Sequence, residues 1–570
     1  MKVATYIAQF IKEKGINTVF ELQGGMITRL LDEFNKHGGF NIVSMHHEQA
    51  AAFAADAFGR ITGKPGIALG TSGPGATNLV TGIGSCFFDS VPAIFITGQV
   101  NLSEQKNNRT TRQIGFQETD IVSIVKPITK AAYAVKRADD IPVIFKEAWK
   151  ISLEGRPGPV LIDIPMDLQK EEIQGSQDTC PFEEINYNEC EIRKYIDEFR
   201  SYLKKSKRPL VLAGHGVRLA NSTKEFLNFI EKLNLPVVTS LLGMDNINFN
   251  HPNRIGFIGT YGNRWANYAL GTCDLLLVLG SRLDLRQTGS DLHSFMKDKI
   301  IFHIDIDKAE LNNRIKKCKI LRAGVAEFLQ LALQSGSSKQ KFTGWFNEIN
   351  QKRHLLPDTA ELTKVNGINP NVFIHLLSHC SKEARVLTTD VGNNQMWVAQ
   401  SIELNPDQRF LSSGGMGAMG YSLPAAIGAS YALNRAIVLT IIGDGGFQIN
   451  IQELQTIRRN NLPVKMVILN NHSLGMIRQF QDAYFNSCYQ STVNGYSTPN
   501  FEKVAIAYGI NAVSIESPDE IEFGLKSLWQ NPNEPFLLNV KLDIYTNVYP
   551  KMMFGNTLTN MEPANLDLNK

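Results

Sequence analysis

A strand–turn–helix–strand pattern in the last third of the chain constrains the fold more than any other feature. Residues 436–442 form an apolar run typical of a buried strand, and the tight turn GDGG, which contains Asp444, follows it. Apolar residues then recur at helical spacing up to Pro463, which precedes a second apolar run at 464–469. This βαβ unit predicts that Asp444 and Asn471 lie at neighbouring strand ends, where α/β sheets bind ligands.

Asp444 and Asn471 offer oxygen ligands of the kind that Mg²⁺ prefers, and a free backbone carbonyl just beyond them would add a third. Diphosphate oxygens would complete the octahedron of such an ion. A turn carboxylate beside a capping asparagine is the alternative interpretation, and for GDG alone it is the commoner one. The complete pattern of strand, GDG, helix, strand and NN is more specific, and it resembles the diphosphate-binding motif of thiamine-diphosphate (ThDP) enzymes.

Length and composition describe a globular protein of several domains. At 570 residues the chain is too long for one core, so about two to four domains are expected. A net charge of +3, from 58 basic and 55 acidic residues, gives no electrostatic reason to expect a nucleic-acid partner. No apolar run approaches the roughly 20 residues that span a bilayer, so no membrane partner is expected.

The cysteines and the N-terminal residues predict a cytoplasmic protein. The seven cysteines are scattered and never spaced as CxxC, which indicates reduced thiols rather than a disulfide framework or a zinc site. Residues 1–15 have the pattern of an amphipathic helix, because Lys12, Glu13 and Lys14 interrupt any apolar core of a signal peptide.

Alternating strand and helix patterns predict an α/β protein with three doubly wound parallel-sheet domains. Polar stretches near 170–190 and 336–366 are expected to be linkers. The expected divisions are an N-terminal domain at 1–170, a central Rossmann-like domain at 190–336, a C-terminal domain at 367–550 and a tail at 551–570.

Glu48 is the most informative residue of the first domain, because it stands between a strand and an alanine-rich helix. It could be an ordinary negative charge at a helix N-terminus, worth about half a kcal/mol. It could instead meet a ring nitrogen of the ThDP aminopyrimidine, where a desolvated carboxyl would hold the imino tautomer that accepts the proton of thiazolium C2. The local pattern does not decide between the two.

The sequence GGMGAMG at 414–420 contains four glycines, which would let the backbone approach a flat ligand closely. A mobile loop is the alternative interpretation. The methionines at 416 and 419 would be unusual in a loop that only meets solvent.

Together with HHEQAAAFAADAFGR, GTSGPGATN, DSVPAIFITGQV, GFQETD, GRPGPVLIDIP and GDGGFQIN, these motifs resemble the acetohydroxyacid (acetolactate) synthase branch of the ThDP enzymes. The motifs occur in family order over more than five hundred residues. The resemblance implies PYR, central and PP domains, and an obligate homodimer that could pair into a homotetramer. It also implies that ThDP is held between the PYR domain of one chain and the PP domain of the other.

By the same resemblance, Glu48 activates the aminopyrimidine, Met419 supports the bent cofactor and the Gly417 carbonyl accepts from the 4′-amino group. The implied Mg²⁺ ligands are Asp444, Asn471 and the carbonyl of Ser473. Gln117 and Arg286 match catalytic positions that face the substrate. Further implied cofactor contacts are Thr71, Pro74, Asn78, Val391, Gly392, Asn393, Asn394, Gly415, Met416, Gly443, Gly445, Gly446, Leu474, Gly475 and Met476.

FAD binding is left open by the resemblance. Related enzymes hold a non-redox FAD in the central domain, but an acidic residue that the family places near Gly324 is absent here. The positions that match the FAD pattern are Arg156, Gly214, Gly216, Ser240, Leu241, Arg282 and Asp305.

Four departures from the family concern the second substrate, and one of them is Leu22-Gln23-Gly24-Gly25 in place of a GYPGG turn. Met166 stands where the family has lysine, Phe480 where it has the tryptophan of the acceptor site, and Thr260-Tyr261 replaces a methionine–histidine pair. Loss of a cation and a reshaped pocket would alter the acceptor more than the chemistry on the cofactor.

The expected function is that of a ThDP- and Mg²⁺-dependent carboligase. The donor would be a 2-oxo acid, with pyruvate first, and the leading acceptor is a second 2-oxo acid, which gives acetolactate. The alternatives are a different acceptor such as a keto-sugar nucleotide, a plain decarboxylase or a C–C hydrolase. A non-catalytic paralogue is disfavoured because Glu48, Asp444 and Asn471 are all retained.

Overall fold

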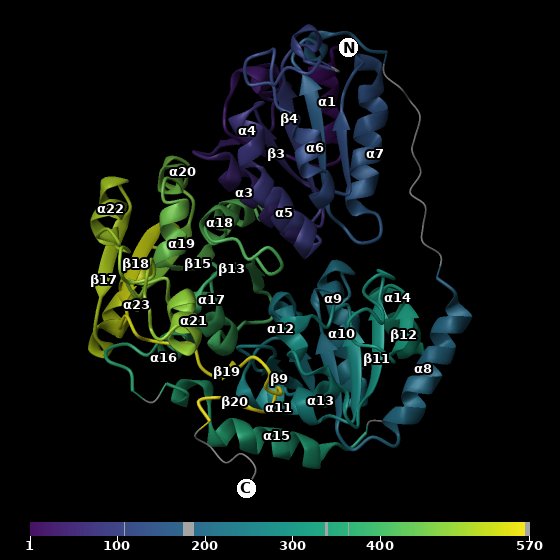
Figure 1. The fold of residues 1–570 in the computed structure, drawn as a ribbon, viewed down its shortest axis with the longest axis vertical. Helices are drawn as coiled ribbons and strands as arrows, with labels where there is room; N and C mark the ends of the chain where they lie inside the picture. Colours follow the sequence, from purple (N-terminus) through teal and green to yellow (C-terminus); the bar gives the residue numbers. More distant parts are fainter. Residues whose placement is uncertain (108, 175–186, 337–339, 363, 565–570) are drawn as a thin grey trace.

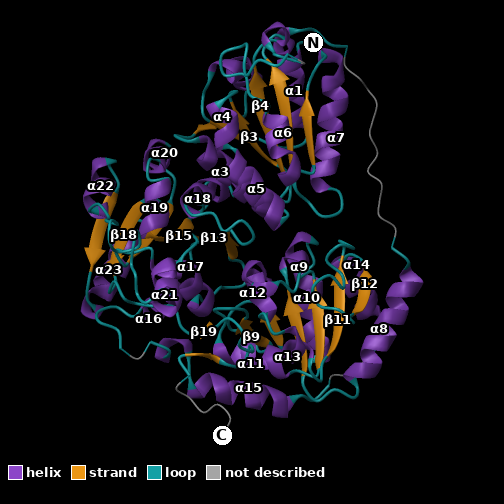
Figure 2. Ribbon diagram, in the orientation of Figure 1, coloured by secondary structure: helices purple, strands orange, loops and turns teal. Residues whose placement is uncertain are grey.

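The computed structural model describes the chain except for residues 108, 175–186, 337–339, 363 and 565–570. Three parallel six-stranded sheets follow one another along the chain, each with its own helices (Figures 1 and 2). Most inner strands are buried along their whole length, so helices cover both faces of each sheet, as expected for a doubly wound fold. The predicted fold class is therefore confirmed.

The first sheet has the strand order β2-β1-β3-β4-β6-β5. Its strands are β1 (Thr18–Glu21), β2 (Asn41–Ser44), β3 (Gly66–Gly70), β4 (Ala93–Gln99), β5 (Ala131–Ala134) and β6 (Pro159–Pro165). Its helices are α1 (Val3–Glu13), α2 (Thr28–His37), α3 (Glu48–Thr62), α4 (Pro74–Asn78), α5 (Val80–Asp89), α6 (Ile121–Val125) and α7 (Ile141–Leu153).

The second sheet has the order β12-β11-β10-β7-β8-β9. Its strands are β7 (Pro209–Ala213), β8 (Val237–Thr239), β9 (Arg254–Phe257), β10 (Leu275–Leu279), β11 (Ile300–Asp305) and β12 (Lys319–Arg322). The helices of this region are α8 (Glu189–Leu203), α9 (His215–Leu219), α10 (Thr223–Leu233), α11 (Arg264–Thr272), α12 (Leu285–Thr288), α13 (Leu292–Met296), α14 (Val325–Gln334) and α15 (Thr343–Leu355).

The third sheet has the order β14-β13-β15-β16-β18-β17. Its strands are β13 (Val386–Thr389), β14 (Arg409–Ser412), β15 (Val438–Gly443), β16 (Val464–Asn470), β17 (Asn511–Ile515) and β18 (Phe536–Lys541), and a small antiparallel pair, β19 (Lys551–Met552) and β20 (Met561–Glu562), follows. Its helices are α16 (Pro370–Cys380), α17 (Asn393–Ser401), α18 (Ser422–Ala432), α19 (Asp444–Ile449), α20 (Glu453–Arg459), α21 (Gly475–Tyr484), α22 (Phe501–Ala507) and α23 (Ile521–Trp529).

The predicted βαβ unit is present, with a different helix. Strands β15 and β16 pair in parallel with Gly443 opposite Leu469, so Asp444 and Asn471 leave neighbouring strand ends as expected. A single helix was expected between them, but the structure has two short ones. The first, α19, begins at Asp444 itself, and the chain leaves helical geometry before α20 begins.

The polar stretch that was expected to be the second linker contains a helix, α15. Trp345 and Ile349 are its buried residues, and both belong to the core of the central domain. Two apolar anchors in a polar helix suffice to dock it there, although they are too few to produce a clear amphipathic pattern. The first expected linker lies mostly in 175–186, outside the described residues.

The first and third domains share one hydrophobic core, and α3 and α18 cross within it (Figure 1). A Cβ atom on Gly428 of α18 would overlap the carbonyl of Ala54 in α3. Gly59 lies inside α3, where its missing side chain leaves room for the carbonyl of Pro92. Small residues thus fix the close packing of these two domains. Among the described residues, no helix has both the length and the apolar character needed to cross a membrane.

Candidate functional site

The polar end of β15 and β16 carries the predicted metal ligands. Asp444 is the first residue of α19, directly after β15, and Asn471 is the first residue after β16. Both side chains are buried, with exposed fractions of 2% and 4%. Ser473, two residues farther along, is buried as well. The parallel register of the two strands therefore brings all three predicted ligands to one edge of the third sheet.

The Asp444 carboxylate is held by backbone N–H groups rather than by a cation. Its Oδ1 accepts from the N–H of Gly445 at 2.8 Å and its Oδ2 from the N–H of Ser473 at 3.2 Å. Burial raises the pKa of Asp444 to about 7, against the lowering effect of these donors. Since no lysine or arginine forms an ion pair with Asp444 in the described chain, the site has the uncompensated charge that a divalent ion would neutralise.

The surroundings of Asp444 have unmet hydrogen-bonding capacity. The side chain of Asn471 makes no hydrogen bond to any described residue, and Ser473 Oγ and Asn393 Oδ1 are buried without a partner. A Cβ atom on Gly475 would overlap the amide groups of Asn393 and Asn471, so only glycine fits there. This donor set of oxygens in a tight recess fits Mg²⁺ together with a diphosphate.

Met419 of the GGMGAMG loop reaches the same place. A Cβ atom on Gly445 would lie 3.1 Å from Met419 Cε and 2.7 Å from a methyl group of Leu474. Asn394 belongs to the cluster too, because its Oδ1 lies 2.8 Å from the Cβ position of both Gly392 and Gly443. The cluster thus joins predicted residues from four separate segments of the third domain.

Two aspartates that were not predicted hold the glycine loop in place. Buried Asp390 accepts from the N–H groups of Gly420 and Ser422, both at 2.9 Å. At the other end of the loop, Asp89 of the first domain accepts from the N–H groups of Gly414 at 2.9 Å and Gly415 at 2.6 Å. The loop is therefore fixed from both domains, and the mobile-loop interpretation does not fit these contacts.

Asp89 belongs to a buried network at the junction of the first and third domains. Arg60 donates to Asp56 at 2.6 Å and to Asp89 at 2.8 Å, and the hydroxyl of Tyr421 donates to Asp56 at 2.7 Å. These contacts connect residues that are far apart in the sequence, and no local motif indicates them. The network links the glycine loop to α3, the helix that begins at Glu48.

Glu48 lies at the carboxyl edge of the first sheet, as predicted. It is the first residue of α3, it is 6% exposed, and its Oε2 accepts from Nδ2 of Asn78 at 2.9 Å. Its Oε1 lies 3.3 Å from the position of a Cβ on Gly75, which follows Pro74 in α4, and the same Cβ position lies 2.8 Å from a methyl group of Thr71. Glu48, Thr71, Pro74 and Asn78 are therefore one cluster.

The two residues predicted to face the substrate lie in different places. Gln117 joins the Glu48 edge: its carbonyl accepts from Ser72 Oγ at 2.7 Å, and its backbone has a φ of 67°. Arg286 is an exposed residue of α12 in the central domain, where its carbonyl accepts from the N–H of Thr260 at 2.8 Å. In the single chain, no hydrogen bond between described residues connects Arg286 with Glu48.

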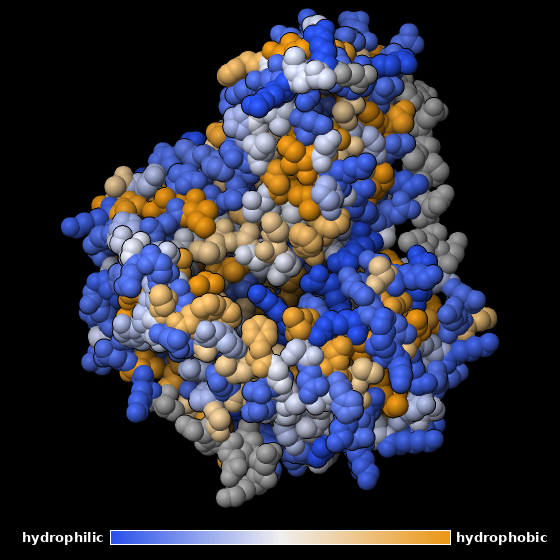
Figure 3. All heavy atoms as spheres, viewed as in Figure 1, coloured by the Kyte–Doolittle hydropathy of each residue, from blue (hydrophilic) through white to orange (hydrophobic). Residues whose placement is uncertain are grey.

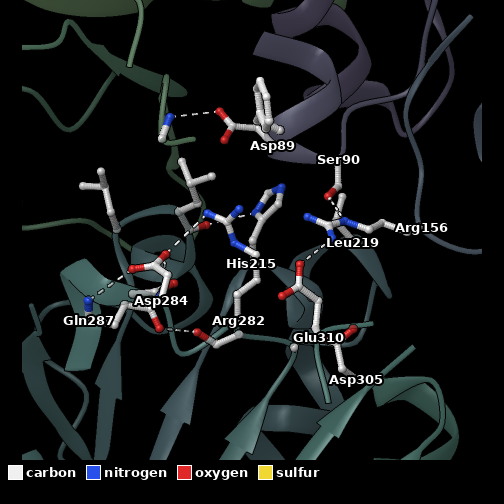
Figure 4. Close-up of a pocket in the computed structure, with 18 of the residues that line it drawn as sticks. Asp89, Ser90, Arg156, His215, Leu219, Arg282, Asp284, Gln287, Asp305 and Glu310 are labelled. Carbon is white, nitrogen blue, oxygen red and sulfur yellow. Dashed lines mark hydrogen bonds and ion pairs between the residues drawn. The ribbon is translucent and has the colours of Figure 1, made fainter. Parts of the chain in front are cut away.

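Arg286 instead lines a cavity of about 310 Å³ where the three domains meet (Figure 4). The same region is a hollow on the molecular surface, with hydrophilic side chains on one side of it and more apolar ones on the other (Figure 3). Of the seven positions that match the FAD pattern, six line this cavity, and Gly214 lies behind it against Gly280. The lining includes Arg156, Gly216, Ser240, Leu241, Arg282 and Asp305.

The cavity combines positive and negative groups. Arg156 donates to Ser90 at 2.7 Å and to Glu310 at 2.8 Å, which ties the first domain to the central one. Asp305 is buried, and burial raises its pKa to about 6. Burial also lowers the pKa of His215 to about 4, so this ring is neutral at physiological pH.

The predicted cofactor residues therefore form two separate clusters in one chain, which we call half-sites. The Glu48 cluster lies on the first sheet and the Asp444 cluster on the third, and no hydrogen bond or ion pair between described residues joins Glu48 to Asp444. Their residue types match the two ends of one cofactor, with a carboxylate for a basic ring and a metal site for a diphosphate.

Comparison with protein families identifies the three domains. Residues 1–124 match the model of the thiamine pyrophosphate enzyme N-terminal TPP binding domain, residues 196–331 the central domain, and residues 390–540 the C-terminal TPP binding domain. Thiamine pyrophosphate is another name for ThDP. The chain belongs to the thiamine pyrophosphate enzyme family.

Within that family the chain is similar to acetolactate synthases. It is 36% identical to the acetolactate synthase large subunit of Lactococcus lactis subsp. lactis, with 96% of this chain and 94% of the relative covered. It is 34% identical to the acetolactate synthase isozyme 2 large subunit of Escherichia coli, with 98% and 99% covered. Identity to the chloroplastic acetolactate synthase of Arabidopsis thaliana is 35%, with 98% and 84% covered.

Proposed function

We propose that this protein is a ThDP- and Mg²⁺-dependent carboligase that decarboxylates pyruvate and joins the remaining two-carbon unit to a second 2-oxo acid, which gives acetolactate. The observation that carries the proposal is the buried Asp444–Asn471–Ser473 edge, which fits a metal-bound diphosphate. Full-length similarity to proteins named acetolactate synthases supports this reaction over the other acceptors considered for the scaffold.

When bound, ThDP supplies the electron sink for the carbanion that decarboxylation leaves. The chain's own part is binding, orientation and proton transfer. The metal ion would be held by Asp444, Asn471 and the Ser473 carbonyl. Met419 would support the cofactor, and Leu474 lies on the same side. Glu48, kept in place by Asn78, would exchange a proton with the aminopyrimidine ring.

Gln117 and Arg286 are proposed to handle the substrates. A guanidinium matches a carboxylate with two parallel hydrogen bonds, so Arg286 suits the carboxylate of a 2-oxo acid. Phe480 and Tyr484 of α21 have ring centroids 4.8 Å apart and are both exposed in the single chain. We assign Phe480 to the acceptor side of the site, where a smaller ring than tryptophan leaves more room.

Cofactor dependence tests this proposal. After dialysis against a chelator, the protein is expected to consume pyruvate only when ThDP and Mg²⁺ are both restored. Mass spectrometry verifies that ThDP and Mg²⁺ have been removed. Pyruvate consumption by the protein when ThDP or Mg²⁺ is then left out would contradict the proposed mechanism.

We also propose that the active site forms between two copies of the chain. The separation of the Glu48 and Asp444 clusters within one chain supports this arrangement. Mixing Glu48→Gln chains with Asp444→Ala chains is then expected to restore about a quarter of the wild-type activity. Half of the twofold dimers would be mixed, and one of the two sites in each would be intact. The measurement is activity after denaturation and joint refolding. If both groups acted within one chain, mixing would restore nothing.

We further infer that the interdomain cavity takes FAD. Its arginines suit the diphosphate and buried Asp305 suits ribose hydroxyls, while Glu327, which the sequence pattern did not indicate, places a carboxylate directly against Gly324. These residues fit a dinucleotide in size and polarity.

Asp305→Asn is expected to weaken FAD binding by about tenfold or more, because a hydrogen bond to a charged group contributes about 1.5–3 kcal/mol. Titration of flavin-free protein, followed by absorbance near 450 nm, measures this. The control is Asp298→Asn, an exposed aspartate just before the same strand. Wild-type protein that takes up no FAD would contradict the inference.

A further inference from the structure

A buried chain of hydrogen bonds crosses the first sheet and ends at Gln117. It starts at Asp163 on β6, passes through Gln99, the last residue of β4, and reaches Ser72 just after β3. These three strands are neighbours in the sheet. The exposed fractions are 6% for Asp163, 5% for Gln99 and 1% for Ser72. Polar groups at this depth need partners, and here they are partners of one another.

The side-chain amide of Gln99 has one favourable orientation. Its Nε2 donates to Asp163 Oδ2 at 2.9 Å and to the carbonyl of Thr119 at 2.8 Å, while its Oε1 accepts from the N–H of Val100 at 3.0 Å. A flipped amide would place its oxygen against a carboxylate and its NH₂ group against an N–H donor. Asp163 is fixed in turn, because its Oδ1 accepts from Thr97 Oγ1 at 2.6 Å. Gln99 therefore ties the segment at Thr119 to the sheet.

Gln117 has an uncommon backbone conformation, with a φ of 67° that few residues with a side chain adopt. Such a conformation persists where the contacts around it fix it. Ser72 Oγ lies 2.7 Å from the Gln117 carbonyl and 2.8 Å from Gln99 Oε1, so its one proton is shared between two acceptors. A Cβ atom on Gly73 would lie 3.0 Å from Gln117 Cβ, so glycine leaves room for the turn. The side-chain amide of Gln117 makes no hydrogen bond to any described residue and is free to meet a ligand.

We propose that Ser72 and Gln99 are positioning residues for Gln117: together they hold the backbone at 117–119 so that the Gln117 side chain faces the substrate. This inference rests on the proposed function, because it assumes that Gln117 acts on the substrate. The two buried residues act through Gln117 and not on the substrate themselves.

Double-mutant kinetics with pyruvate test whether Ser72 acts through Gln117. Ser72→Ala removes only the hydroxyl, and kcat/KM is expected to fall by about 10- to 100-fold, the effect of a small misplacement of a group that meets the substrate. Gln99→Met keeps the length of the side chain and should lower kcat/KM by at least as much. Added to Gln117→Ala, Ser72→Ala is expected to change kcat/KM by no more than about twofold, because the group that it positions is already gone.

Ser152→Ala is the matched control, because Ser152 is similarly buried in the same domain but donates to the carbonyl of Trp149 at 2.8 Å. Its kcat/KM is expected to stay within about twofold of the wild-type value. If the losses of Ser72→Ala and Gln117→Ala multiplied in the double variant, Ser72 would act by another route and the inference would be overturned. A Ser72→Ala protein with wild-type kcat/KM would overturn it as well.

Hydrogen–deuterium exchange tests the hold on the backbone without an assay of activity. In this segment the N–H groups of Glu118 and Ile121 donate to backbone carbonyls. In full-length Ser72→Ala they are expected to exchange about 2- to 10-fold faster than in wild type, as the loss of one hydrogen bond implies. Unchanged exchange would overturn the inference. Faster exchange in Ser72→Ala, together with wild-type protein that consumes no pyruvate, would instead contradict the proposed function.

Discussion

Glu48→Gln is expected to lower kcat by about 10²- to 10⁴-fold, the range that a positioned acid or base contributes. Glutamine keeps the shape of the side chain, and its carbonyl oxygen can still accept from Asn78 Nδ2. It cannot exchange a proton, so the aminopyrimidine would lose its partner. ThDP affinity should change far less than kcat, because the diphosphate contacts lie on the other half-site.

The measurement for Glu48→Gln has two parts: steady-state kinetics with pyruvate, and the rate of hydrogen–deuterium exchange at C2 of bound ThDP by proton NMR. Glu453→Gln is a matched control, since Glu453 is also a buried glutamate near α3 and accepts from the N–H of His46 at 2.9 Å. It should leave C2 exchange unchanged. A Glu48→Gln protein with wild-type exchange would show that another group carries the proton.

Asp444→Ala is expected to weaken binding of Mg²⁺ with ThDP by more than about 100-fold, because removing a ligand should exceed the effect of removing a ligand's hydrogen-bond partner. The carboxylate is the only charged group among the three proposed ligands, so its loss removes the main attraction for the ion. Asp444→Asn keeps an oxygen and should fall between the alanine variant and wild type.

Calorimetric titration of the apoprotein with ThDP, at fixed Mg²⁺ concentration, measures the effect at Asp444. Asp482→Asn serves as the control, since Asp482 lies on α21 and pairs with Arg478 at 2.8 Å rather than with the metal edge. It should bind ThDP with nearly wild-type affinity. If Asp444→Ala bound ThDP normally, the metal site would have to be placed elsewhere.

The sequence predicted the strands that carry the metal site because they are buried and continuous. The runs before Asp444 and Asn471 became β15 and β16, side by side and in parallel. The short strands β5, β8, β9, β12, β14 and β17 were not predicted, since runs of three to five residues are too short to show a clear period. The helix α15 was not predicted either, because only two of its residues are buried and the stretch around them is polar.

Motifs predicted the residues of the two half-sites, and the structure places the members of each close together. What local patterns could not show is how long-range contacts hold them. Asp89 of the first domain, for example, accepts hydrogen bonds from the glycine loop, more than three hundred positions farther along the chain. Such contacts depend on the tertiary fold and leave no signal in residue spacing.

Three of the four departures from the family lie apart from the Glu48 and Asp444 clusters, whereas Gly24 of the fourth packs against Thr71 of the Glu48 cluster. Met166 and Phe480 are partly exposed, and Thr260 lines the interdomain cavity. Changes there can alter the fit of the second substrate while the groups that serve the cofactor stay in place. We therefore expect the acceptor preference, rather than the decarboxylation step, to distinguish this protein from its relatives.

Carbon-13 NMR of the protein with ThDP, Mg²⁺ and [3-¹³C]pyruvate distinguishes acetolactate formation from plain decarboxylation, because it identifies the product as well as the loss of substrate. We predict that labelled acetolactate accumulates with the wild-type protein and is absent with Asp444→Ala. Labelled acetaldehyde in its place would reveal a plain decarboxylase. Pyruvate that remains intact, although ThDP and Mg²⁺ are bound, would contradict the proposed reaction.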